Sequence, residues 1–502
     1  MFHAPRLFTI AFTCLALGPL AAAGCGDSSS DAPGAMPQGD AGPDALPDAT
    51  GGGADAADGS NEAELTAPQA PFEVFAVAEA TQVTLSWAAV PGAVSYDIYW
   101  GMAAGITTSS TKIAGATSPY VHTGLATDTT YFYRVAAVNA VGATLSAEIS
   151  ARVFTLAGTF ASTGDMNAPR VYHAATRLQN GKVLLTGGEG GAPVSAELYD
   201  PATGTFTATG AMKTARQDHV ATLLADGRVL ITGGLSGDLL ASAEIFDPAS
   251  ESFTVTGSMS VARRFHSAVL LPNGKVLVVG GTWAEEASTP GEEASTPADE
   301  IFDPATGKFT ATGNSGNVLH WHTATLLQSG KVLVAGGALD DVDGTGLASA
   351  SLYDPGTGKY TPTGNMTKAR VAHTATLLPN GKVLIAGGGK SAASPTLADA
   401  ELYDPATGTF IAAENQMSRA RGSHAAALLH NGKVLLVAGF PGNAIAPMKC
   451  DLFDFRTGKF EPTGDYPEGL YHYTATTLVD GEVLIAGGTN VLGPRQQARL
   501  FR

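Results

Sequence analysis

The sequence predicts an all-β protein built from many short strands, and three observations support this. Gly is abundant, with 61 of 502 residues, whereas charged residues make up only 15%. Apolar residues make up 44%, which is enough to form hydrophobic cores. From residue 170 onward one pattern of strands and tight turns recurs seven times. Glycine-rich turns between short apolar stretches are typical of β-sheets, and a chain of this length is expected to hold several domains.

The N-terminal segment 1–25 has the layout of an export signal. Arg6 precedes an apolar run over residues 7–19 that is too short for a stable membrane span, and small residues then lead to Cys25. Residues 22–25, Ala-Ala-Gly-Cys, resemble a bacterial lipobox, in which the cysteine is lipidated, although Ala stands at position 22 where Leu is usual. We expect an exported lipoprotein of the cell envelope, at the outer membrane or cell surface, held to the membrane by this anchor. The alternative is cleavage after Ala23 and a secreted product.

Two segments separate the signal from the repeats. Residues 26–66 carry nine Asp and Glu but no Lys or Arg, and we expect them to be a disordered acidic tether. Residues 67–156 contain short alternating strands, with Trp87 on one, Tyr96 on the next, and Tyr131 shortly after Leu125. This pattern resembles a fibronectin type III domain, whose tyrosine corner the last pair would form. We expect this domain to act as a spacer.

The repeated unit has a constant internal order. A His begins six of the units and is followed by two strands and a pair of glycines, as His173 is by Gly187-Gly188, with Ala438-Gly439 in the sixth unit. A further strand then ends in an aromatic residue and Asp, and Pro follows in the first five units. This key position is filled by His173, His219, His266, His322, His373, His424 and, in the seventh unit, Tyr473. The diglycines, the terminal aromatic residue and a period of about 50 residues resemble the kelch repeats of galactose oxidase-like propellers. The resemblance implies that residues 157–502 form a seven-bladed kelch-type β-propeller.

The two ends of the repeat region complement each other. The seventh unit stops at Phe501-Arg502, whereas residues 158–164 match residues 204–210 of the first unit. We therefore expect residues 158–164 to supply the outer strand of the last blade, which leaves no unpaired edge in the ring.

The residue immediately before each key position varies between units, unlike its surroundings. A position freed from uniform packing is expected at a loop surface or at the mouth of the channel. Aromatic and polar side chains there would suit a sugar or a peptide, although burial beneath loops is an equal alternative. The candidate binding face consists of Tyr172, Phe265, His320, Trp321 and His472.

No catalytic or metal-binding set emerges from the sequence, and we expect no cofactor. Histidines repeated once per blade are spread around a ring and do not converge on one ion. Tyr172-His173 resembles a copper-binding pair of galactose oxidase-like enzymes, but those enzymes also need a cross-linked cysteine, and the folded region offers only Cys450. Asp341 and Asp343 beside a glycine form a weak calcium candidate, against the alternative of a solvated turn.

These observations favour a monomeric binding protein over an enzyme. The net charge of −17 argues against a nucleic-acid partner, because phosphate contacts need clustered Lys and Arg. We expect a surface-exposed lipoprotein that binds or scaffolds a protein or glycan through the loop face of the propeller. The alternative is a propeller enzyme acting on carbohydrate, either a hydrolase or an oxidase.

The lipid anchor can be tested directly. Metabolic labelling with palmitate should tag the protein, and Cys25→Ser should abolish the label because the thiol is the acylation site. Fractionation of the cells supplies the second measurement. If the Cys25→Ser variant stays in the membrane fraction as fully as the wild type, the anchor hypothesis is wrong.

Overall fold

The computed structural model describes residues 66–71, 74–153, 157–191, 193–281, 298–315, 319–338, 345–391, 395–440 and 447–502. Within these ranges the regular elements are all strands, so the all-β prediction is confirmed. No helix there is long and apolar enough to cross a membrane. The predictions for Cys25, for the tether up to residue 65, and for Asp341 and Asp343 concern residues outside these ranges.

The first eight strands form two antiparallel sheets. One has the order β1-β2-β5, and the other has the order β4-β3-β6-β7 with β8 also paired to β6. Val83 and Leu85 alternate with half-buried neighbours and face the core, as the period of two in a strand requires. The strands are β1 Phe75–Glu79, β2 Gln82–Ser86, β3 Ser95–Gly101, β4 Thr111–Ala116, β5 Tyr120–Thr123, β6 Thr129–Val138, β7 Ala143–Leu145 and β8 Ile149–Val153.

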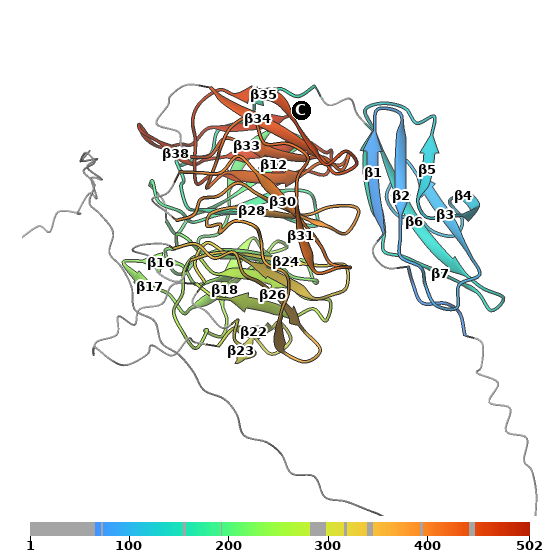
Figure 1. Ribbon diagram of the computed structural model, residues 1–502, viewed down its shortest axis with the longest axis horizontal. Helices are drawn as coiled ribbons and strands as arrows, with labels where there is room; N and C mark the ends of the chain where they lie inside the picture. Colours follow the sequence, from blue (N-terminus) through green and yellow to red (C-terminus); the bar gives the residue numbers. More distant parts are fainter. Residues whose placement is uncertain are drawn as a thin grey trace, which may run out of the picture. The chain divides into compact units, whose positions relative to one another are not determined.

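The repeats form seven four-stranded antiparallel sheets (Figure 1). The first three are β10 Ala174–Arg177, β11 Val183–Thr186, β12 Ala196–Asp200 and β13 Thr205–Ala208; β14 Val220–Leu223, β15 Val229–Thr232, β18 Ala243–Asp247 and β19 Ser252–Val255; and β20 Ser267–Leu270, β21 Val276–Val279, β22 Glu300–Asp303 and β23 Lys308–Ala311. The next three are β24 Thr323–Leu326, β25 Val332–Ala335, β26 Ala350–Asp354 and β27 Lys359–Pro362; β28 Thr374–Leu377, β29 Val383–Ala386, β30 Ala400–Asp404 and β31 Thr409–Ala412; and β32 Ala425–Leu428, β33 Val434–Val437, β34 Met448–Asp454 and β35 Lys459–Tyr466.

The seventh sheet joins the two ends of the repeat region. It consists of β36 Thr474–Thr477, β37 Val483–Ala486, β40 Ala498–Phe501 and β9 Phe160–Ser162. The outer strand β9 pairs antiparallel with β40, with Phe160 opposite Phe501. Two short hairpins lie in connections between the second and third strands of a sheet, β16 Leu235–Ser236 with β17 Asp238–Leu239 in the second unit, and β38 Thr489–Asn490 with β39 Gly493–Pro494 in the seventh.

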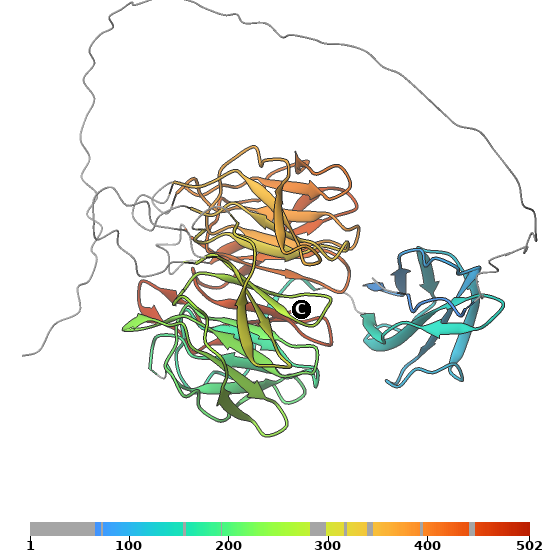
Figure 2. The same ribbon diagram turned by 90° about the horizontal axis from the view of Figure 1, so that it is seen from below.

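The sheets pack face to face in a closed series. The second strand of each sheet, such as Val-Leu-Leu-Thr in β11, is buried at every position, because a neighbouring sheet covers each of its two faces. Seven apolar clusters join each sheet to the next, and one of them joins the first sheet back to the last through Tyr199, Leu484 and Leu500. Figures 1 and 2 show these sheets gathered in one body. The fold is therefore β-propeller-like.

A ring of backbone hydrogen bonds reinforces this packing. In each unit the second residue after the buried strand donates its N–H to a carbonyl that lies three residues before the key position of the next unit, at 2.8 to 3.0 Å. The seventh bond, from Gly488 to Arg170, returns to the first sheet. The donor and acceptor pairs are Gly188 with Arg216, Gly234 with Arg263, Gly281 with Leu319, Gly337 with Arg370, Gly388 with Arg421, Gly439 with Leu470, and Gly488 with Arg170.

Five units contain a buried ion pair at the same place. An Arg before the key position reaches a carboxylate on the third strand at 2.5 to 3.2 Å, and its guanidinium also donates to the carbonyl of the residue that follows the buried strand. The pairs are Arg170–Glu197, Arg216–Glu244, Arg263–Glu300, Arg370–Glu401 and Arg421–Asp451. The two remaining units have lost both partners, with Leu319 and Ser351 in one and Leu470 and Arg499 in the other.

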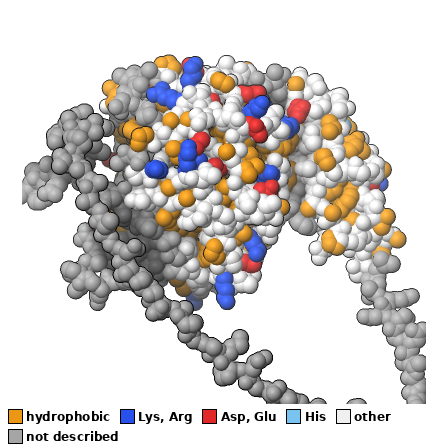
Figure 3. Space-filling model, viewed as in Figure 1, with side chains coloured by type: hydrophobic (Ala, Val, Ile, Leu, Met, Phe, Trp, Pro, Cys, Tyr) orange, Lys and Arg blue, Asp and Glu red, His pale blue; other side chains and the backbone are white. Residues whose placement is uncertain are grey.

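The surface carries a second recurrent pair. The Lys of the first turn lies beside the Asp at the end of the third strand in five units, as in Lys382–Asp404 at 3.0 Å. Figure 3 shows Lys and Arg interspersed with Asp and Glu on the face drawn, without a large area of one sign. Exposed pairs of this kind contribute little to stability, so the buried pairs are expected to dominate.

The joint loss of Arg and acid predicts how the buried pairs respond to mutation. Glu197→Ser should lower the free energy of unfolding by about 3–5 kcal/mol, because it removes the carboxylate that pairs with the buried Arg170 guanidinium. Arg170→Leu/Glu197→Ser copies the fourth unit and should recover more than half of that loss. Urea unfolding measures both variants. Lys182→Ala, which breaks the exposed pair with Asp200 in the same unit, should cost less than about 1 kcal/mol, and an equal cost for Glu197→Ser would contradict this account.

Candidate functional site: the mouth of the ring

Seven residues, one from each unit, meet at the centre of the ring. They are the residues immediately before the key positions, and each has a left-handed backbone, with φ between 47° and 59°. A non-glycine residue in this region is uncommon and strained, and such residues concentrate where ligands bind. We call these residues the mouth ring: Tyr172, Asp218, Phe265, Trp321, Ala372, Ser423 and His472.

The strained backbone is held by the contacts on both of its sides. Two residues earlier stands the buried Arg, or its Leu replacement, whose carbonyl bonds to the preceding sheet. The residue in between forms an isolated β-bridge with the residue that follows the diglycine, as Val171 does with Glu189. Directly between neighbours of the mouth ring, Asp218 donates its N–H to the carbonyl of Tyr172, and Ser423 to that of Ala372, both at 3.0 Å. The scaffold therefore sets the side-chain directions and leaves side-chain identity free.

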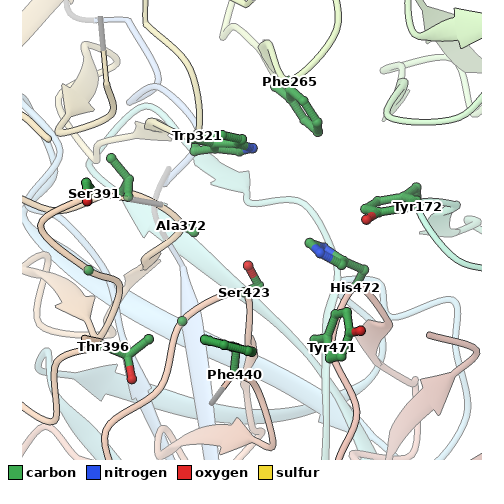
Figure 4. A pocket seen from close by; sticks show the side chains of 13 residues that line it. Tyr172, Phe265, Trp321, Ala372, Ser391, Thr396, Ser423, Phe440, Tyr471 and His472 are labelled. Carbon is green, nitrogen blue, oxygen red and sulfur yellow. The ribbon is translucent and has the colours of Figure 1, made fainter. Parts of the chain in front are cut away.

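The upper cavity has a volume of about 340 Å³ and lies off centre. It extends over the fifth and sixth units, because Ala372 and Ser423 are the two smallest members of the mouth ring. Figure 4 shows the rings of Tyr172, Phe265, Trp321 and His472 turned toward a common space. Phe440, Tyr471, Ser391 and Thr396 complete the labelled wall. No Asp, Glu, Lys or Arg is among the described residues that line this cavity.

The aromatic side chains of the wall contact one another in two groups. Tyr172 and His472 have ring centroids 4.4 Å apart, and Tyr471 meets the same imidazole at 5.2 Å. Phe265 and Trp321 lie 5.4 Å apart, in the tilted geometry that aromatic pairs favour. Burial raises the pKa of Tyr172 to about 12 and lowers the pKa of His472 to about 4, so both are neutral at physiological pH. The wall therefore offers aromatic faces and uncharged hydrogen-bonding groups.

The lower cavity, of about 330 Å³, lies at the level of the key histidines. It shares six members of the mouth ring with the upper cavity, so the two are continuous. Its lining adds Asp218, Val220, Tyr473 and the six key histidines.

Five of the key histidines link neighbouring sheets. The Nε2 atom of each lies 2.8 to 3.1 Å from a threonine hydroxyl of the preceding sheet, as in His373 with Thr323. Tyr473 takes the same role in the seventh unit, where its hydroxyl accepts from the N–H of Ala425 and donates to the carbonyl of Val437. Burial lowers the pKa of His173 to about 3, and the pKa values of the other five are also lowered by burial. These imidazoles are therefore neutral.

The sequence-derived candidates fall in different places. Tyr172, Phe265, Trp321 and His472 line the upper cavity together. His320 is 3% exposed and bonds through its backbone to Ala338, and it lines neither cavity. Phe440, Tyr471 and the carboxyl group of Asp218 also line the cavities and were not predicted from the sequence. One available signal was the mouth-ring position itself, which lacks both glycine and β-branched residues in all seven units, as a left-handed backbone with a side-chain function requires.

The side chains do not fit a copper centre of the kind the fold resemblance implies. Among the described residues, no group of three or more His, Cys, Asp and Glu is placed to hold a metal ion. His173, the best copper candidate, directs Nε2 to Thr474 at 3.1 Å. Cys450 lies fully buried on the third strand β34.

Comparison with known proteins supports the fold. No family model matches the sequence, and no curated protein matches it. Among solved structures, the chain is similar to a fungal alcohol oxidase of the AA5 family in complex with copper, with a TM-score of 0.56 and 21% sequence identity. The match covers 68% of this chain and 75% of that one. The two proteins share a β-propeller-like, galactose oxidase-like fold.

Proposed function

We propose that this protein is a seven-bladed propeller that binds a glycan in the upper cavity of its mouth. The observation that carries the proposal is the wall, in which four aromatic side chains from four units face one space beside hydroxyl groups, and none of the described lining residues is charged. Sugar rings have apolar faces that stack on aromatic rings and hydroxyls that bond to neutral polar groups. The cavity volume is at the lower end of the range for small-ligand sites, which suits one or two sugar units better than a protein surface.

The architecture supports this proposal. Seven sheets joined by seven clusters and seven backbone bonds are what a seven-bladed ring requires. The preceding sandwich has Leu125 buried and the Tyr131 hydroxyl accepting from the N–H of Ala126 at 3.0 Å, which is the contact of a tyrosine corner. We infer a fibronectin type III domain that, together with the proposed lipid anchor and tether, acts as a spacer between the membrane and the propeller.

A second candidate function is an oxidase acting on carbohydrate. The structural similarity to the alcohol oxidase favours this class, whereas the side chains of the mouth favour binding. Likeness at 21% identity supports a shared fold, and the fold alone does not carry the reaction. Measurements on the ligand site and on copper distinguish the two.

Filling the upper cavity should block glycan binding. Ala372→Phe places a ring where the space lies, and the equivalent position in the third unit already holds Phe265 at a φ of 53°, so the backbone accepts it. We expect the affinity for sugars that bind the wild type on a glycan array to fall at least about tenfold, measured by calorimetry. Val491→Phe, at a residue 57% exposed and outside the cavity lining, serves as the control. Undiminished affinity in Ala372→Phe would place the glycan site elsewhere.

If the protein is a glycan-binding protein and not a copper oxidase, added copper should not change its melting temperature. A metal that binds only the folded state stabilises it by about 2.7 kcal/mol at a hundredfold excess over its dissociation constant. We therefore expect the same melting temperature with copper and with a chelator. If stoichiometric copper survives dialysis and is lost in His173→Ala, the oxidase becomes the better hypothesis.

A further inference from the structure

The lower cavity contains a carboxyl group that glycan stacking does not use. Asp218 belongs to the mouth ring, its side chain is only 6% exposed, and it lines the lower cavity but not the upper one. Among the described residues it is the only Asp, Glu, Lys or Arg in that lining. Because the key histidines are neutral, the charge of the lower cavity is set by this carboxyl group.

The carboxylate of Asp218 is only partly compensated. The nearest cation is Arg264, whose Nη1 lies 3.9 Å from Oδ2, at the outer limit of an ion pair. The same guanidinium stacks on the ring of Phe265, 4.7 Å from its centroid. Glu189 and Tyr172 are the other titratable groups that act on this site, and the charge of Glu189 opposes ionisation of Asp218. Burial dominates these effects and raises the pKa of Asp218 to about 7.

Aromatic rings surround the same space. Tyr172, Phe265 and Trp321 line both cavities, so they flank the passage between them. The faces of such rings attract cations, and aromatic side chains combined with a carboxylate are suited to ammonium groups. A ligand in the upper cavity is able to extend one group through this passage toward Asp218.

We propose that the lower cavity is a subsite for an ammonium group, which is held between the carboxylate of Asp218 and the rings of Tyr172, Phe265 and Trp321. This inference rests on the proposed binding function of the mouth and specifies its ligand as a molecule that carries a primary or quaternary ammonium group. In its ionised form the carboxyl group repels an anion. A metal ion is disfavoured, because five of the six key histidines already bond to threonine hydroxyls.

The sign of the pH dependence follows from the raised pKa. Below pH 7 the carboxyl group is protonated and gives no attraction to a cation, whereas above pH 7 it is ionised. The affinity for a permanent cation should therefore rise about tenfold between pH 6 and pH 8. His472 and His173, with pKa values of about 4 and about 3, remain neutral through this interval, as does Tyr172, with a pKa of about 12.

The test uses choline and its neutral isostere 3,3-dimethylbutan-1-ol, titrated by calorimetry into the full chain. At pH 8 choline should bind at least tenfold more tightly than 3,3-dimethylbutan-1-ol. Only the affinity for choline should depend on pH. Asp218→Asn should abolish the preference for choline over 3,3-dimethylbutan-1-ol and the pH dependence of choline binding. Asn tolerates the left-handed backbone of this position, so the variant should fold. Asp238→Asn removes an exposed charge from β17 of the same unit and should change neither.

The outcomes separate this inference from the glycan proposal. Equal binding of the two probes, or a preference that survives in Asp218→Asn, overturns the ammonium subsite and leaves the glycan site standing. Choline binding that depends on Asp218, in a protein that binds no sugar, supports the subsite and overturns the glycan site. Failure of both probes to bind the wild type overturns the inference.

Discussion

The buried ion pair between an Arg and a third-strand carboxylate is the interaction on which the mouth of the ring depends. A guanidinium is able to bond to several acceptors in one plane, and here it joins the carboxylate to the backbone carbonyl that follows the buried strand. Its own carbonyl accepts a hydrogen bond from the preceding sheet. One residue thus ties together its own sheet and the one before it. Removing one charge alone would leave the other buried, which explains why two units lack both.

This arrangement separates the support of the mouth from its chemistry. The ion pairs, the diglycine turns and the histidine–threonine contacts recur with little change, and they hold one left-handed residue of each unit at the centre of the ring. Because backbone contacts hold that residue, its side chain ranges from Ala372 to Trp321 without altering the ring. The uneven sizes of these side chains displace the upper cavity toward the fifth and sixth units.

The all-β class was predictable from the sequence, and so was the repeat, because each depends on local features such as turn residues and apolar spacing. Four of the five candidate binding residues also lie together, since they share a position relative to the key histidines. His320 does not line the cavities, because it precedes the mouth-ring residue Trp321, forms a backbone bridge with Ala338 of its own unit and stays buried. The role of Asp218 could not be predicted from the sequence, because its raised pKa comes from burial in the folded chain and its partner Arg264 belongs to the next unit. The absence of both the Arg and the acid from two units was visible in the sequence. The structure explains it, because the two side chains form a buried ion pair in the other five units.

The pairing of β9 with β40 has a consequence for how the protein is made. β9 begins at Phe160 and β40 begins at Ala498, so nearly the whole repeat region separates two strands of one sheet. During synthesis β9 emerges before the other strands of the seven sheets, and its partner β40 is made last. For that whole interval the hydrogen-bonding edge of β9 is unpaired and open to incorrect pairing with other strands. β9 spans only Phe160–Ser162, and so short a strand offers few groups for such pairing. Completion of the ring is thus a late, single event, so a chain interrupted before residue 498 has a ring that cannot shut.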